Sequence, residues 1–131
     1  MTPYDRLRTL CAWANQHHLR FASASVATRP WQTYANSGRA LAAFDRRMER
    51  LGDPHDRQAQ RDKAFPWLVY EYRMERVTAQ LCVPTRAREL DEDILRGNAC
   101  AASVIFGVDA EEVERWLRTG NVAQDEGSGG R

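Results

Sequence analysis

The sequence predicts an all-α fold, a small bundle of about five to six helices that ends in a closely packed helix pair. Apolar residues recur at steps of three and four along most of the chain, the spacing of one helix face. Outside residues 22–27, no segment alternates as a half-buried strand would. A chain of 131 residues that is 43% hydrophobic suits one domain, placed at residues 1–120. The glycine-rich residues 121–131 lack hydrophobic periodicity and are expected to form a disordered tail.

Helical patterns and one small-residue stretch account for the first half of the chain. The first helix is expected at residues 3–18, with an apolar stripe that consists of Tyr4, Leu7, Leu10, Cys11 and Ala14. Residues 22–27 are alanine, serine and valine, which predict a loop or a short strand. A second helical region reaches Leu51, with a break expected at residues 36–38, where a glycine follows a polar pair. The polar residues 53–63 predict either an exposed short helix or a mobile loop.

The residues that follow Pro66 carry the clearest helical stripe. Its apolar members are Trp67, Tyr70, Met74, Val77 and Leu81. Pro84 is expected to end that helix, because proline cannot continue it. A fourth helix is expected from about residue 85 to Gly97 and Asn98, residue types that commonly close a helix. Two short helices follow, at residues 99–106 and 109–119.

Residues 99–120 contain one motif with an informative spacing. Small side chains at Ala102 and Ser103 allow two helices to cross closely, and Gly107 permits the positive φ of a tight turn. Asp109 is well placed to cap the second helix. The apolar side chains expected to seal the core between the two helices are Phe106, Val108, Val113 and Trp116.

This segment resembles a helix-turn-helix, and it is most similar to the motif of the MerR and excisionase type. The resemblance covers about 22 of the 131 residues. It implies that residues 110–118 form the recognition helix, whose N-terminal side chains approach base edges in the major groove of DNA. The residues to which it assigns DNA contacts are Ala110, Glu111, Glu114, Arg115 and Arg118. Of these, the two arginines suit phosphate or guanine.

Charge is distributed unevenly along the chain. Residues 1–88 contain 15 basic and 8 acidic side chains, whereas residues 89–131 contain 4 basic and 10 acidic ones. This asymmetry predicts a positive face and a negative face. Further DNA contacts are expected from Arg46, Arg47 and Arg50. These arginines would track a phosphate backbone if their helix lies beside the recognition helix; otherwise they belong to a solvated surface with interleaved acids.

Two functions from different classes fit these features. The first is a small DNA-binding regulatory protein, of phage or bacterial type, that works as a homodimer on paired half-sites of double-stranded DNA. The second is a non-enzymatic interaction module that docks an acidic C-terminal face on a basic protein partner. The acidic face would consist of Glu111, Glu112 and Glu114.

Catalytic and cofactor motifs are missing from the sequence, so we expect a protein that is not an enzyme and binds neither a cofactor nor a metal. It contains no glycine loop for phosphate, no nucleophile elbow and no HExxH. The remaining catalytic alternative is a Cys11 nucleophile activated by His17 or His18. Neither a secretory leader pattern nor an apolar segment of bilayer length is found, which predicts a cytoplasmic protein without a membrane partner.

Overall fold

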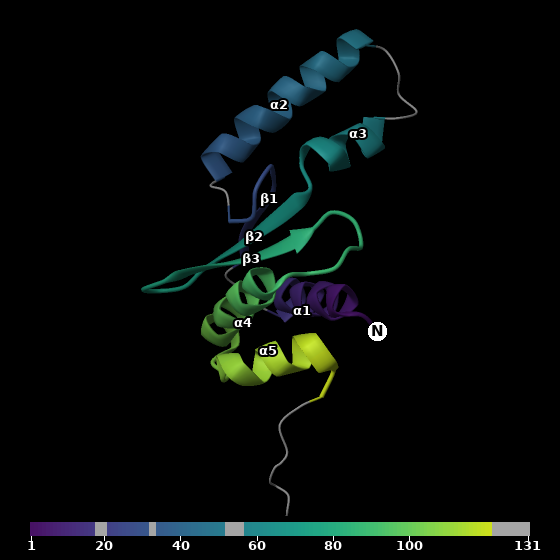
Figure 1. Cartoon of the computed structure of the whole chain (residues 1–131). Helices are drawn as coiled ribbons and strands as arrows, with labels where there is room; N and C mark the ends of the chain where they lie inside the picture. Colours follow the sequence, from purple (N-terminus) through teal and green to yellow (C-terminus); the bar gives the residue numbers. More distant parts are fainter. Residues whose placement is uncertain (18–20, 32–33, 52–56, 122–131) are drawn as a thin grey trace, which may run out of the picture.

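The computed structural model describes residues 1–17, 21–31, 34–51 and 57–121 of the chain. Eight elements follow one another there (Figure 1). They are α1 (Pro3–His17), β1 (Phe21–Ala27), α2 (Tyr34–Leu51), α3 (Arg57–Ala64), β2 (Trp67–Arg73), β3 (Thr78–Pro84), α4 (Glu92–Phe106) and α5 (Ala110–Thr119). In Figure 1 the sheet lies in the middle, with α2 and α3 above it and α1, α4 and α5 below. Apart from Asn121, the predicted tail lies outside the described residues.

The fold is mixed, with helices and a sheet, and the all-α prediction is wrong. The three strands form an antiparallel sheet in the order β1-β2-β3. The first predicted helix is confirmed as α1, and of the alternatives left open, β1 is a strand and α3 a short helix. The predicted break at residues 36–38 is wrong, because α2 runs through these positions without interruption.

The third predicted helix is instead a β-hairpin. β2 and β3 pair along their whole length, and across the turn the Met74 amide donates to the Val77 carbonyl oxygen at 2.9 Å. Trp67 and Val69 face one apolar cluster, whereas Tyr72 faces another. Because apolar side chains are buried on both faces, the strand lacks the polar alternation that would distinguish it from a buried helix.

The helix α4 joins two helices that the sequence pattern separates. It continues through Gly97 and Asn98, where an end was predicted. A Cβ atom at Gly97 would lie 2.7 Å from the ring of Trp31, so glycine here permits close packing rather than helix termination. Asn98 is fully buried and forms hydrogen bonds with Cys82 in the sheet and Ile94 in its own helix.

The side-chain amide of Asn98 closes the outer edge of the sheet. β3 is the last strand in the order, so among the described residues no further strand pairs with its outward backbone groups. The Cys82 amide donates to Asn98 Oδ1 at 2.7 Å, and Asn98 Nδ2 donates to the carbonyl oxygens of Cys82 at 2.8 Å and Ile94 at 2.9 Å. The side chain of Asn98 therefore pairs with the backbone of Cys82 as a residue of a neighbouring strand would, and this pairing fixes α4 against β3.

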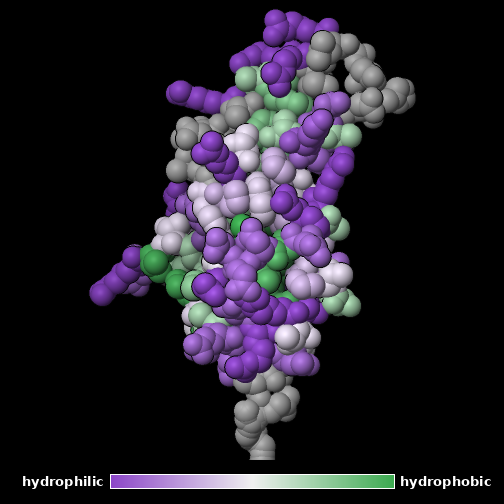
Figure 2. All heavy atoms as spheres, in the orientation of Figure 1, coloured by the Kyte–Doolittle hydropathy of each residue, from purple (hydrophilic) through white to green (hydrophobic). Residues whose placement is uncertain are grey.

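The main core lies between the sheet and the helices α1, α4 and α5. Its fully buried members are Leu7, Ala14, Tyr72, Leu81, Val83, Ala102 and Leu117. At the other end, Phe44 of α2 meets Phe65 edge to face, with ring centroids 5.5 Å apart, and both pack with Val26 of β1. Hydrophilic side chains project over α2 at the top of Figure 2 and over α4 and α5 lower down.

Replacing Asn98 by alanine tests the closure of the sheet edge. The Asn98→Ala variant leaves the Cys82 amide and carbonyl buried without partners, which should lower the free energy of unfolding by about 2–4 kcal/mol. Urea unfolding followed by circular dichroism measures this value. Ser103→Ala in the same helix is the control, with an expected cost below about 1 kcal/mol. Similar losses in the two variants would contradict a special role of Asn98.

Candidate functional site

The turn between α4 and α5 has the local geometry that the motif predicts. Gly107 adopts a left-handed conformation with φ of 67°, and the Asp109 side chain accepts from the Glu112 amide at 3.2 Å. The predicted roles of Gly107 in the turn and of Asp109 as the helix cap are therefore confirmed. Val108 was expected in the core between the helices, but it is 44% exposed. The turn thus places an apolar side chain in solvent.

Arg6 of α1 holds the opposite end of α5. The residue is only 7% exposed, and its guanidinium donates to the carbonyl oxygens of Leu117 at 2.8 Å and Arg118 at 2.9 Å. A cation at this position satisfies the last carbonyl groups of the helix and complements the helix dipole. Sequence reasoning missed Arg6, because nothing local distinguishes it from a solvated arginine on α1. α5 is consequently fixed at both ends.

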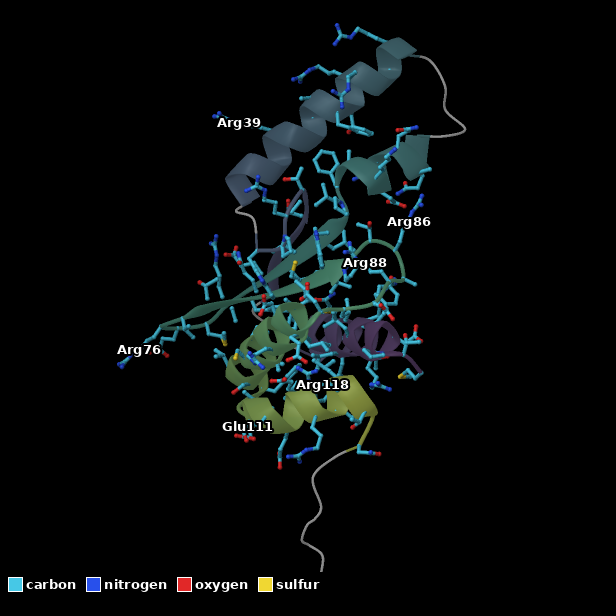
Figure 3. The ribbon with its side chains drawn as sticks, in the orientation of Figure 1. Arg39, Arg76, Arg86, Arg88, Glu111 and Arg118 are labelled. Atoms are coloured by element: carbon cyan, nitrogen blue, oxygen red, sulfur yellow. The ribbon has the colours of Figure 1, made fainter. Side chains whose placement is uncertain are left out.

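Ion pairs connect α4 with α5 around Arg118 (Figure 3). Arg118 lies 2.6 Å from Glu114 and 2.7 Å from Glu92, and Arg96 lies 3.5 Å from Glu92 and 3.7 Å from Glu114. Hydrogen bonding to Arg118 holds the pKa of Glu92 below its usual value. Two of the residues assigned to DNA, Glu114 and Arg118, are therefore engaged within the protein.

The other residues assigned to DNA on α5 line an open groove beside α4. Ala110, Glu111 and Arg115 border this groove of about 590 Å³, whose α4 side carries Arg96 and Cys100. Glu111 and Arg115 are exposed, and Ala110 is half-buried. Among the described residues, no carboxylate forms an ion pair with Arg115. Arg115 is thus the α5 cation best placed to meet an external anion.

The arginines of α2 lie at the opposite end of the molecule from α5 (Figure 1). The sequence hypothesis required Arg46, Arg47 and Arg50 to lie beside the proposed recognition helix. The structure instead separates them from it. Arg46 and Arg50 are exposed. The guanidinium carbon of Arg47 lies 5.8 Å from the centroid of the Phe44 ring, so this side chain leans towards the apolar side of α2.

Three arginines on α2 form what we call the basic stripe, which consists of Arg39, Arg46 and Arg50. Separations of seven and four residues place them within about 40° of one another around the helix and over about 16 Å of its length. All three are exposed, and Arg39 points into solvent in Figure 3. The acidic residues Asp45 and Glu49 both fall to one side, about 60° or more from each arginine. The stripe becomes visible only when the residues are placed around the helix, because in the linear sequence acidic residues stand between these arginines.

The environment of Cys11 does not favour its role as a catalytic nucleophile. Burial raises the pKa of the Cys11 thiol to about 12, so the thiol stays protonated at neutral pH. His18 lies outside the described residues. Among the residues that the structure does describe, no group of three or more histidine, cysteine or acidic side chains is arranged to hold a metal ion.

The ion pairs around Arg118 should make stability depend on pH. A carboxyl group whose pKa is lowered by folding stabilises the fold at neutral pH and loses that contribution as the pH falls through its folded-state pKa. Glu92→Gln should therefore be less stable than the parent at pH 7, and the difference should shrink as the pH is lowered and the Glu92 carboxyl takes up a proton. Urea unfolding over a series of decreasing pH values checks this, with Glu89→Gln, in the loop before α4, as the control. A difference that persists at low pH would contradict an electrostatic origin.

No helix within the described ranges combines the length and the apolar composition needed to span a bilayer. Comparison of the chain with protein-family models, with curated proteins and with solved structures found no match in any of the three.

Proposed function

We propose that this is a small DNA-binding regulatory protein that contacts the phosphate backbone through the basic stripe on α2. The observation that carries the proposal is the alignment of three exposed arginines along one face of the helix. Each DNA strand carries a negative charge about every 3.4 Å along the helix axis, so a stripe of about 16 Å runs beside several phosphates. Guanidinium groups suit this contact, because they bind phosphate oxygens in pairs.

The surroundings of the stripe support contact with an external anion. Asp45 and Glu49 lie on one flank, and no carboxylate among the described residues forms an ion pair with a stripe arginine. Arg118, in contrast, already pairs with two carboxylates. Within the described part of the chain, the stripe arginines therefore have no ion pair that must break before they reach a phosphate.

The α4–α5 unit is less suited to the phosphate contact. The first turn of α5 presents Glu111 and Glu112, which repel phosphates. A recognition role for α5 would thus depend mainly on Arg115. A regulator of this kind would act in the cytoplasm, and a homodimer would double the number of stripe contacts on paired half-sites.

A second function is favoured by those same acidic residues. Glu111 and Glu112 are exposed, and no cation among the described residues forms an ion pair with either. We infer that α5 docks on a basic protein partner, since complementary charge speeds the encounter and fixes the orientation. The two functions use opposite ends of the molecule and are compatible with each other (Figure 1).

Removal of the stripe charges tests the first function. The triple variant Arg39→Ala/Arg46→Ala/Arg50→Ala should bind random-sequence duplex DNA more weakly than the parent. Fluorescence anisotropy across salt concentrations measures the binding. If each arginine neutralises one phosphate, the slope of log K against log salt should become shallower by about 3.

A matched variant removes the same charge elsewhere. Arg73→Ala/Arg76→Ala/Arg86→Ala acts on β2, the hairpin turn and the loop after β3, and Figure 3 shows Arg76 at the tip of the hairpin. Equal losses in the two triple variants, or no DNA binding by the parent at low salt, would contradict the stripe. Weaker binding by Arg115→Ala with no effect of the stripe variant would instead identify α5 as the DNA contact. Circular dichroism verifies that each variant is folded.

A further inference from the structure

An aromatic pair, the exposed Trp13 and the half-buried Phe106, lies beside the turn between α4 and α5. The ring of Trp13, on α1, stacks on Phe106 at the end of α4, with ring centroids 4.6 Å apart and an interplanar angle of 28°. Trp13 is 50% exposed, although tryptophan side chains are on average highly buried. The stacking orients the Trp13 ring, so the pair offers an ordered apolar surface to solvent.

Val108 adds apolar surface at the same turn. It lies two residues after Phe106 and directly after Gly107, whose left-handed conformation reverses the chain. The side chain that the motif assigns to the interior is therefore available for an external contact. We call Trp13, Phe106 and Val108 together the elbow surface.

Two carboxylates lie three and four residues after Val108, and neither forms an ion pair with a cation in the described part of the chain. Glu111 and Glu112 lie in the first turn of α5 and are exposed. The neighbouring cations Arg96 and Arg118 pair with other carboxylates, those of Glu92 and Glu114. Arg115 borders the same groove as Glu111 but forms no ion pair with Glu111 or Glu112, so within the described residues both carboxylates remain without an ion pair.

We propose that the elbow surface docks a basic amphipathic helix of a protein partner. The apolar face of that helix would cover Trp13 and Val108, and its lysine or arginine side chains would pair with Glu111 and Glu112. This inference rests on the second function proposed above and specifies the chemistry of its partner. Charge complementarity selects this occupant, because the same carboxylates repel nucleic acid and acidic segments.

The elbow surface is small and rigid, which favours a helical partner that binds through a few apolar side chains. Tryptophan is among the residues that contribute most to protein interfaces, and a bound helix presents apolar side chains at steps of three and four. The Trp13 ring is already stacked, and the turn is fixed by the Asp109 cap. Little conformational entropy remains to be lost on binding, which lowers the cost of association.

A synthetic peptide provides the test. The probe is a fluorescein-labelled amphipathic helix of about 18 residues, with leucine on one face and lysine on the other. One comparison peptide carries glutamate in place of lysine, and another contains the same residues in shuffled order. We expect fluorescence anisotropy to detect binding of the leucine–lysine helix to the full chain and little binding of the other two. Absence of binding, or equal binding of the shuffled peptide, would overturn the proposal.

Separate variants distinguish the apolar contact from the charge contact. Val108→Ser and Trp13→Ala should each weaken peptide binding about tenfold. Val77→Ser is the matched control, because this valine is 46% exposed at the hairpin turn and lies outside the elbow surface. The double variant Glu111→Lys/Glu112→Lys should also weaken binding, whereas Glu75→Lys/Glu89→Lys should not. Circular dichroism and urea unfolding verify that every variant is folded.

The pattern of losses separates this proposal from the function on which it rests. Weaker binding only after charge reversal would support an acidic docking face and overturn the elbow surface. If binding weakens only in the apolar variants, Glu111 and Glu112 do not contribute to it, which would contradict the proposal that the partner is basic. An equal effect of Val77→Ser and Val108→Ser would show that the peptide has no defined site, which overturns both.

Discussion

The pairing of Asn98 with the backbone of Cys82 is the contact on which the rest of the fold depends. An edge strand needs partners for its outward amide and carbonyl groups, and a side-chain amide can both accept and donate as a peptide group does. With Asn98 in this position, α4 lies along the sheet edge, so Ile94 joins the cluster on one face and Leu95 the cluster on the other. A single helix thereby closes two apolar clusters, which a helix packed on one face could not do.

The position of α4 in turn determines the position of α5. The turn at Gly107 is short, and the far end of α5 is held by the buried guanidinium of Arg6. A tilt of α5 would break these hydrogen bonds and leave two donor groups of the buried Arg6 guanidinium without their acceptors, which is costly. Glu111 and Glu112 are therefore held at the surface by contacts made elsewhere. The elbow surface is, on this view, a consequence of core packing rather than of a separate binding segment.

The elements that the sequence predicts correctly are those with local signals. Gly107 and Asp109 determine the turn within three residues, so their roles could be read without any knowledge of the fold. The pairing of Asn98 with Cys82 and that of Arg118 with Glu92 could not be predicted, because these partners lie 16 and 26 residues away along the chain. Gly97 was misread for the same reason, since its neighbour is the ring of Trp31. Long-range packing thus determines both the sheet edge and which arginines of the candidate site remain available for an external ligand.

The unequal charge of the two parts of the sequence becomes a separation in space. The basic stripe on α2 and the acidic first turn of α5 lie at opposite ends of the molecule, with the sheet between them (Figure 1). A molecule with this polarity orients in the field of DNA, the stripe towards the phosphates and the carboxylates away from them. The elbow surface would then remain accessible while the stripe is occupied. Under the proposed function, this arrangement would explain the acidic residues on α5, because at that end of the molecule they would attract a basic partner and stay away from the DNA.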